Sequence, residues 1–184
     1  MAIHEKFGHG KCLNGNKPND KVYTPETVAK DIINRFNLSG KVLDPFYGKG
    51  AFYNNFPENV EKDYCEIDLG KDFFEYTDHV DWIVSNPPYS IYTEVMAHSY
   101  EIADNIVYLI PLNKIVSSWG RVKELAAYGG IPYIYILPAG KCGFPFGFPA
   151  CAVHIKKGYT GDTHVEIMHE EKQEDTEILK LFNV

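Results

Sequence analysis

The sequence has 184 residues, of which 45% are hydrophobic and 23% charged, enough for one compact domain with a sizeable core and too few for two full domains. The aromatic content of 14% argues against a disordered chain. The net charge of −7 does not by itself indicate a nucleic-acid-binding protein, although lysines and one arginine gather at 114–123 while 166–177 is acidic, which leaves room for a local basic face.

The chain opens with an arm over residues 1–21, which is rich in Gly, Asn, Lys and His and has no periodic pattern. The remaining residues, 22–184, are expected to form one domain. A helix is predicted to start with Thr24 as its N-cap and Pro25 at its first helical position, and to end at Ser39-Gly40. Its apolar face is predicted to be Val28, Ile32, Ile33 and Phe36.

From there strand patterns and helix patterns alternate. Strands are predicted over 41–44, 63–67, 82–85, 105–110, 133–137, 150–155 and 165–169, and helices over 92–103 and 119–128, with a further helix beginning at Ala51. This order predicts an α/β fold with a doubly wound, mostly parallel sheet. The late strands follow one another without a helix and predict an antiparallel hairpin at the sheet edge.

Cysteine and hydropathy patterns add expectations about the environment of the chain. Cys12, Cys65, Cys142 and Cys151 form no C-x-x-C pair and are read as free thiols, so no metal site is expected. No apolar run is long enough to cross a bilayer and the N-terminus lacks the apolar block of a signal peptide. A soluble, cytoplasmic protein with no membrane partner is the expectation.

Two features near the first two strands favour a nucleoside-binding site. Asp44-Pro-Phe-Tyr-Gly48-Lys-Gly50 follows the first predicted strand, and its glycines let the backbone approach a ligand closely. Glu66 ends the second strand about twenty residues later, where nucleoside-binding folds place an acid for ribose hydroxyls. Either feature alone is also compatible with an ordinary turn or a solvated strand end.

The most specific feature is Asn86-Pro87-Pro88-Tyr89, directly after the apolar strand over 82–85. Two consecutive prolines fix an extended backbone, so the Asn86 side chain and the Pro87 carbonyl can both act as acceptors for one amino group. Tyr89 places an aromatic ring beside them. The alternative is that Asn86-Pro87-Pro88-Tyr89 is a rigid loop with only a structural role.

Together these motifs resemble the Rossmann-like class I methyltransferases, and within them the amino-methyltransferases marked by [D/N/S]-P-P-[Y/F]. Their order is similar to that of the gamma-type N6-adenine DNA methyltransferases. The resemblance covers residues 22 to about 157 and implies a seven-stranded sheet, S-adenosyl-L-methionine as cofactor and DNA as substrate. The cofactor-binding residues it implies are Tyr23, Thr24, Asp44, Phe46, Gly48, Gly50, Glu66, Ile67, Asp72, Phe73 and Asn86.

The resemblance also implies the chemistry. The adenine N6 lone pair is delocalised into the ring, and two acceptors on its protons favour a pyramidal nitrogen that can attack the methyl group. The catalytic residues would be Asn86, Pro87, Pro88 and Tyr89, with Tyr89 stacking on a flipped base. A second aromatic for the other face is expected from Phe144, Phe146 and Phe148, first of all Phe146, while Tyr92, His98 and Trp119 are read as packing residues.

Several alternatives stay open at this stage. Only about 27 residues follow Lys157, so no recognition domain is evident and specificity could come from the loops over 111–123 and 141–149, from a partner, or from a second copy. The arm carries four lysines that could bind backbone phosphates, or it could be a flexible tail without a function; the lysines are Lys6, Lys11, Lys17 and Lys21. The same N-P-P-Y chemistry suits RNA adenine and glutamine-amide methyltransferases, and a non-catalytic binding subunit is a third reading.

Overall fold

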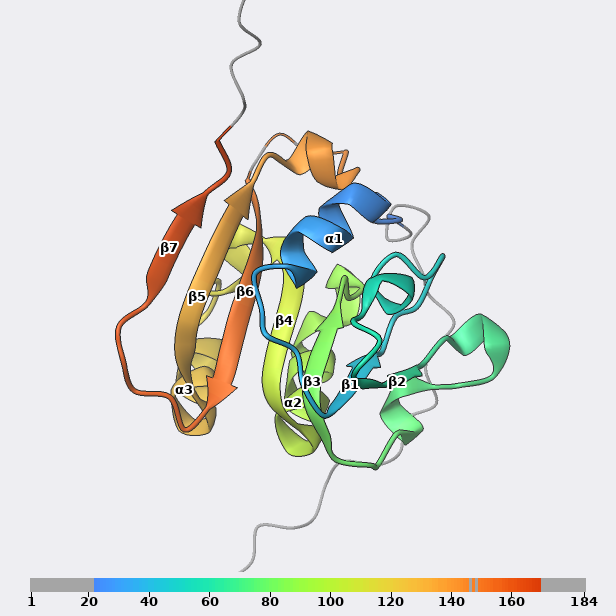
Figure 1. Cartoon of the computed structure of the whole chain (residues 1–184). Helices are drawn as coiled ribbons and strands as arrows, with labels where there is room; N and C mark the ends of the chain where they lie inside the picture. The colour runs from blue at the N-terminus through green and yellow to red at the C-terminus, as the bar shows by residue number, and fades with distance from the viewer. Residues whose placement is uncertain (1–21, 146, 148, 170–184) are drawn as a thin grey trace, which may run out of the picture.

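A computed structural model describes residues 22–145, 147 and 149–169, and the following description concerns these residues. One seven-stranded sheet forms the centre of the molecule, in the order β2-β1-β3-β4-β6-β5-β7 (Figure 1). Its strands are β1 (Lys41–Asp44), β2 (Glu61–Tyr64), β3 (Val80–Ser85), β4 (Ala103–Pro111), β5 (Gly129–Leu137), β6 (Ala150–Lys157) and β7 (His164–Ile167).

A single strand runs against the others in this sheet. β1 pairs in parallel with β2 and β3, β3 with β4, and β5 with β7, whereas β6 is antiparallel to both β4 and β5. The described residues between β5 and β6 form a 3-10 turn, Ala139–Cys142, and no α-helix, so the two strands pair as antiparallel neighbours instead of through a helical crossover. The predicted α/β class, the mostly parallel sheet and the antiparallel hairpin are confirmed.

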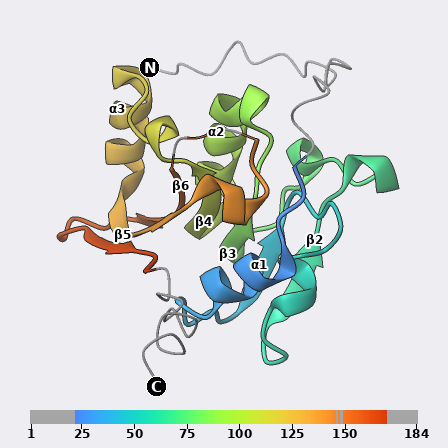
Figure 2. The same ribbon diagram turned by 90° about the horizontal axis from the view of Figure 1, so that it is seen from above.

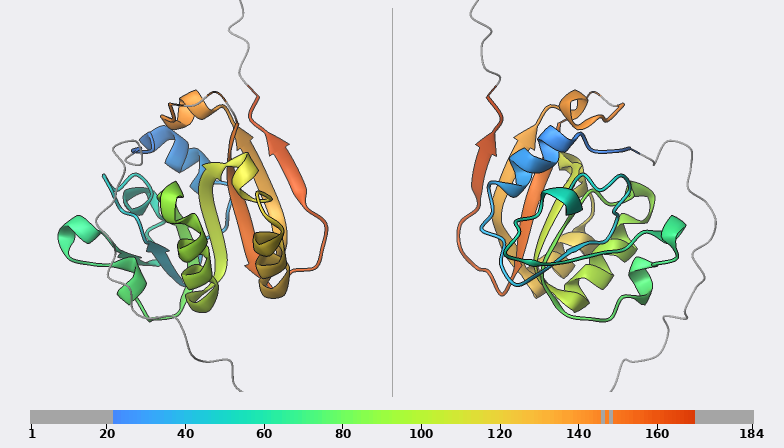
Figure 3. Two further views of the ribbon diagram at one scale, coloured as in Figure 1. Left: turned by 180° about the vertical axis from the view of Figure 1, so that it is seen from behind. Right: turned by 45° about the vertical axis from the view of Figure 1, so that its right-hand side comes forward.

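Helices cover both faces of the sheet. α2 (Tyr92–Ile102) and α3 (Trp119–Tyr128) lie on one face, in front of the sheet in the left view of Figure 3, and α1 (Glu26–Ile33) lies on the other (Figures 1 and 2). Successive side chains of β4 point to opposite faces of the sheet and therefore pack in two different hydrophobic clusters. Val107 and Leu109 pack with α1, and Ile106, Tyr108 and Ile110 pack with α2.

The first helix is shorter than predicted. Pro25 is its N-cap residue in place of Thr24, and the helix ends at Ile33, well before Gly40. Val28, Ala29, Ile32 and Ile33 are buried on its apolar face. The remaining apolar residues up to the first strand, Phe36 and Leu38, still pack on the same core from a non-helical segment.

No α-helix begins at Ala51, which corrects the prediction for that segment. The chain forms only a 3-10 turn over Tyr53–Asn55. Gly48 and Gly50 hold positive φ angles of 54° and 79° just before it, and Pro57 disfavours a helical Phe56 just after it. β2 likewise ends at Tyr64, so Glu66 lies in the turn that follows, as the N-cap of the 3-10 turn Ile67–Leu69.

Within the described residues no helix combines the length and the apolar character that crossing a membrane would require.

Candidate active site

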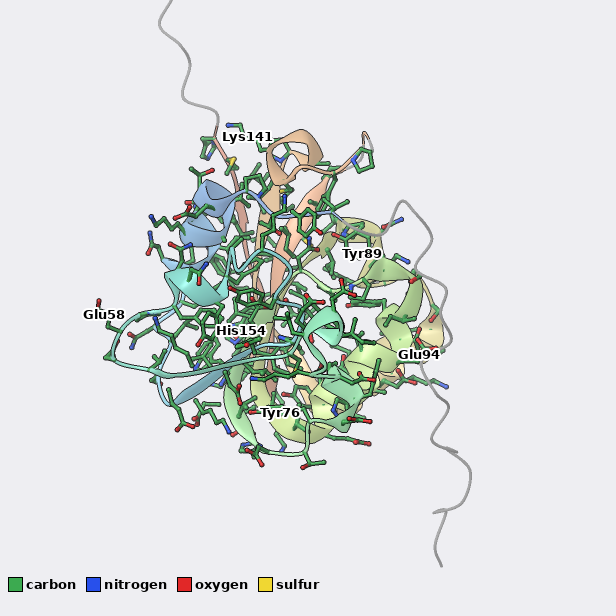
Figure 4. All side chains as sticks on the ribbon, turned by 90° about the vertical axis from the view of Figure 1, so that its right-hand side faces the viewer. Glu58, Tyr76, Tyr89, Glu94, Lys141 and His154 are labelled. Carbon is green, nitrogen blue, oxygen red and sulfur yellow. The ribbon has the colours of Figure 1, made fainter. Side chains whose placement is uncertain are left out.

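The predicted site residues gather at the edge of the sheet where the parallel strands end. β1 ends at Asp44 and β3 ends at Ser85, directly before the glycine loop and the N-P-P-Y segment respectively. The turn over Ala139–Cys142, which follows β5, lies at the same edge because Leu137 and Pro111 both pair with Ala150. In Figure 4, Tyr89 and Lys141 lie toward this edge and Tyr76 toward the opposite one. In open parallel sheets this is the edge that binds ligands.

Asp44 is a buried carboxylate at the centre of this edge, only 1% exposed. Its Oδ1 accepts hydrogen bonds from the Ser85 hydroxyl at 2.6 Å and the Phe46 N–H at 3.3 Å, and its Oδ2 accepts one from the Tyr53 N–H at 3.3 Å. Burial and, less strongly, the charge of Glu66 raise the pKa of Asp44 to about 7, although these hydrogen bonds act to lower it. Ser85 was not among the predicted site residues, because a serine at the end of an apolar strand carries no signal in the sequence.

The glycine loop is tied to Glu66 by a backbone hydrogen bond. The Gly48 N–H donates to Glu66 Oε2 at 2.8 Å, and the Asp68 N–H donates to Oε1 at 3.3 Å. A carboxylate has about four acceptor positions, so Glu66 keeps acceptor capacity for further donors. A Cβ at Gly50 would stand 2.6 Å from Asn54 Nδ2 and 2.8 Å from the Tyr47 hydroxyl, so these side chains would have to move, and the φ of 79° also favours glycine at this position.

Next to Glu66 lies a partly apolar surface. Ile67 is 52% exposed and Phe74 is 36% exposed, although only Ile67 of the two was among the predicted cofactor residues. Phe73 is buried and packs edge-on against Phe46 with ring centroids 5.2 Å apart. Asp72 caps the next turn by accepting from the Phe74 N–H at 3.0 Å. Phe73 thus packs under this surface, and Asp72 holds the backbone of the turn that carries Phe74.

Asn86 links the N-P-P-Y segment to the N-terminal element. Its Nδ2 donates to the Val22 carbonyl and to Thr24 Oγ1, each at 3.2 Å. Two acceptors on the nitrogen fix which end of the amide points where. The amide oxygen Oδ1 therefore faces the other side, where it accepts from the Tyr89 hydroxyl at 2.9 Å.

The prolines of the segment keep the backbone extended, as predicted. Pro88 has φ −66° and ψ 126°, and α2 starts only after the short turn Tyr89–Ile91. The Tyr89 ring packs edge-on against Phe144 with centroids 5.6 Å apart, and Phe144 is only 5% exposed. Phe144 thus supports Tyr89 from the core side, whereas Phe146 and Phe148 lie outside the described residues.

The Tyr23 ring stands beside the glycine loop. A Cβ at Gly48 would lie 3.4 Å from this ring, and the Lys49 ammonium sits 4.3 Å from the ring centroid. Tyr23 is 47% exposed. The N-terminal element and the N-P-P-Y segment, whose bonded residues Val22 and Asn86 are 64 residues apart in sequence, are thereby brought together with the glycine loop at one site.

No protein-family model matches the sequence, and no curated protein matches it. Several solved structures share its fold. A protein of Listeria monocytogenes assigned to the class I S-adenosylmethionine-dependent methyltransferases superimposes with a TM-score of 0.66 at 13% identity, over 91% of this chain and 72% of that one.

Two further structures extend the comparison. A protein of Pyrococcus horikoshii assigned as an RNA methyltransferase gives a TM-score of 0.54 at 13% identity, over 76% of this chain and 87% of its own. The M protein of the type I restriction enzyme EcoKI gives 0.53 at 11% identity, over 73% of this chain and 44% of its own. The chain therefore has the Rossmann-like fold of the class I methyltransferases.

Proposed function

We propose that this protein transfers the methyl group of S-adenosyl-L-methionine to the exocyclic N6 amino group of adenine in DNA. The observation that carries the proposal is the orientation of Asn86, whose amide nitrogen is bound by Val22 and Thr24 so that its oxygen is left to act as an acceptor beside Tyr89. The fold, which is that of proteins assigned as methyltransferases, supports the same conclusion.

The residues at the sheet edge fit the cofactor. Glu66 has free acceptor capacity for the ribose hydroxyls, Ile67 offers an exposed apolar side chain to the adenine ring, and the buried Asp44 offers a negative charge to a cationic amino acid. Gly48 and Gly50 permit close approach of the backbone. When bound, the cofactor supplies an electrophilic methyl group on a sulfonium.

The chain's own residues would activate the amino group. Asn86 Oδ1 and the Pro87 carbonyl would accept its two protons, which favours a pyramidal nitrogen with a localised lone pair. The Val22 and Thr24 contacts hold the Asn86 amide in position before the substrate arrives, so little reorganisation is required. The Tyr89 ring, backed by Phe144, would stack on the base.

DNA is favoured over RNA by the N-terminal element that precedes the glycine loop and contacts Asn86, the arrangement that the gamma-type resemblance implies. The same fold occurs in the M protein of the type I restriction enzyme EcoKI, and this comparison also supports DNA as the substrate. The fold of the protein assigned as an RNA methyltransferase keeps RNA as the second candidate.

The test is methyl transfer by the purified chain. It is incubated with labelled S-adenosylmethionine and, separately, unmethylated genomic DNA, total RNA or a release-factor protein, and nucleic-acid products are digested to nucleosides. N6-methyladenine from DNA is expected. Asn86→Ala is expected to lower the rate by about a hundredfold or more, in the range seen when a preorganised transition-state contact is lost.

Each alternative gives a distinct result. Label in RNA or protein alone keeps the chemistry and overturns the DNA assignment. Tight cofactor binding without transfer to any of the three substrates overturns the enzymatic proposal for the isolated chain. Asn86→Asp is a useful second variant, because it keeps an acceptor but removes the donor that binds Val22 and Thr24.

A further inference from the structure

The segment 112–123 adjoins the candidate site and falls within the loop over 111–123 that the sequence offered as a possible source of specificity. It comprises the 3-10 turn Leu112–Lys114, a connection, and the start of α3. The Leu112 N–H donates to the Pro149 carbonyl at 3.1 Å, and the Lys114 ammonium donates to the Tyr89 carbonyl at 3.4 Å. The segment is therefore anchored both to the loop over 138–149 and to the N-P-P-Y motif.

The middle of this segment projects apolar side chains into solvent. Residues 116–120 are all exposed, with Val116 at 69% and Trp119 at 71%, the two highest values among the exposed large hydrophobic residues of the described chain. Trp119 was expected to be a packing residue, and its exposure corrects that reading. An exposed tryptophan leaves a large apolar area in water, and tryptophan is enriched at binding interfaces.

The exposed position of Trp119 is held in place by its neighbours. Arg121 donates to Thr93 Oγ1 at 2.8 Å and lies 5.3 Å from the centroid of the Tyr92 ring, which ties the start of α3 to the start of α2. The Ser118 hydroxyl caps the helix by accepting from the Arg121 N–H at 3.3 Å. The helix start, and with it Trp119, is thereby ordered next to the N-P-P-Y segment.

The charge of the segment differs from that of the whole chain. Between Leu112 and Lys123 there are three cationic side chains and no carboxylate, in a protein of net charge −7. Lys123 is exposed and follows Trp119 by four residues, so the two share one face of α3. Glu124 and, on α2, Glu94 are the exposed acids nearby in the sequence and fold.

We infer that Trp119 and Lys123 form a nucleic-acid contact beside the active site, where Trp119 stacks on the neighbouring base that is exposed when the target adenine flips out of duplex DNA and Lys123 binds a backbone phosphate. An aromatic ring next to a cation is the combination by which proteins hold bases and phosphates together. The inference rests on the proposed function for its substrate class. It adds a substrate-positioning surface beside the N-P-P-Y segment.

A protein occupant suits the surface less well. The exposed apolar area consists of two side chains, Val116 and Trp119, whereas a stable interface buries about 800 Å² on each partner. The cations of the segment favour a polyanion as the partner. In a symmetric dimer the same cations of both copies would face each other and repel, which disfavours a second copy of the chain.

Tryptophan fluorescence gives a direct readout of the contact. The chain has two tryptophans, and Trp82 is partly buried, stacked on His154 with centroids 5.1 Å apart. With a twenty-base-pair duplex as the probe, we expect quenching in wild type that is lost in Trp119→Phe and retained in Trp82→Phe. Equal quenching in wild type and Trp119→Phe would overturn the inference.

Affinity for the same duplex is measured by fluorescence anisotropy over a range of salt. Trp119→Ala should weaken binding about tenfold, the usual effect of removing one stacked base. Lys123→Gln should reduce the slope of log affinity against log salt by about 0.9, the value for one phosphate contact. The matched controls are Val165→Ala, an exposed apolar residue on β7, and Lys157→Gln, at the far end of β6; both should leave affinity and slope unchanged.

Methyl transfer, assayed in parallel, separates the two proposals. Wild-type methylation of DNA with unchanged affinity in Trp119→Ala overturns the contact and leaves the proposed function standing. Trp119-dependent DNA binding without DNA methylation supports the contact and overturns the function. Quenching by RNA or a release factor but not by duplex DNA, or self-association that Trp119→Ala abolishes, overturns the contact.

Discussion

The two ends of the Asn86 amide serve different purposes. The nitrogen binds the N-terminal element, while the oxygen accepts from the Tyr89 hydroxyl, which also lies 3.3 Å from the Leu109 carbonyl. Tyr89 therefore uses one lone pair of Asn86 Oδ1, and the second lone pair is available to a substrate amino group. The hydroxyl and the ring of Tyr89 can be tested separately.

Tyr89→Phe removes the hydroxyl and keeps the ring. We expect its kcat/KM for methyl transfer to stay within about tenfold of wild type, because the stacking surface remains and Asn86 Oδ1 is left free. Tyr89→Ala should lose about tenfold or more beyond that, since base stacking contributes roughly 1–3 kcal/mol. Equal losses in both variants would mean that the hydroxyl, and not the ring, is what the reaction needs.

Asp44 should make cofactor binding depend on pH. Its pKa is raised to about 7, chiefly by burial, so the carboxyl gains a proton as the pH falls through that value. A cationic cofactor favours the ionised form. We expect the affinity for S-adenosylmethionine, measured by calorimetry, to fall severalfold between about pH 8 and pH 6.

Asp44→Asn is the control for this pH dependence. It keeps a side chain of the same shape next to Ser85 and Phe46 but carries no charge at any pH. Its affinity should be lower than that of wild type at pH 8 and nearly independent of pH. Parallel pH profiles for wild type and Asp44→Asn would assign the dependence to another group.

At the level of elements, the glycine loop can be compared with a second turn of the same backbone shape. Gly50 and Gly70 have φ angles of 79° and 76°, but a Cβ at Gly50 meets Asn54 and Tyr47 whereas a Cβ at Gly70 meets nothing within 4 Å. Gly70→Ala should cost about 1 kcal/mol of unfolding free energy, from the positive φ alone. Gly50→Ala should cost clearly more in urea denaturation, and equal losses would show that the loop absorbs the contact.

Most elements could be predicted from the sequence because their apolar patterns are strong. The helix over Trp119–Tyr128 and the strand over Lys41–Asp44 have the predicted bounds. The errors fall where local chemistry competes with periodicity. The segment after Ala51 has buried phenylalanines at 52 and 56 but is confined between two positive-φ glycines and Pro57, so it forms only a turn.

The site was predicted less completely than the fold, for a physical reason. Motif residues such as Asn86 and Glu66 stand out through their position after a strand, but their partners do not. Ser85, Val22 and Leu109 act through a hydroxyl or a backbone carbonyl, and the sequence does not show which strands bring these groups together. The exposure of Trp119 is likewise set by tertiary packing, since its helical position alone favoured a buried residue.

At the scale of the whole molecule, two buried titratable groups oppose each other in their effect on stability. His154 lies against Trp82 and Phe36, and burial lowers its pKa to about 4 from its ordinary 6.5. The unfolded chain then binds more protons between these values, so His154 reduces stability as the pH falls from 6.5 to 4. The raised pKa of Asp44 has the reverse effect, because the folded state holds its proton and loses stability as the pH rises from 3.8 to about 7.

The two effects overlap between about pH 4 and pH 6.5, so wild type should show an unfolding free energy that varies little there. His154→Gln leaves Asp44 unopposed, and its stability should rise as the pH falls. Asp44→Asn leaves His154 unopposed, and its stability should fall over the same range, by up to about 3 kcal/mol. Urea denaturation at several pH values measures both slopes. If the unfolding free energy changed with pH in the same direction in both variants, the assignment would be contradicted. Opposite directions are expected because burial lowers the pKa of His154 and raises the pKa of Asp44.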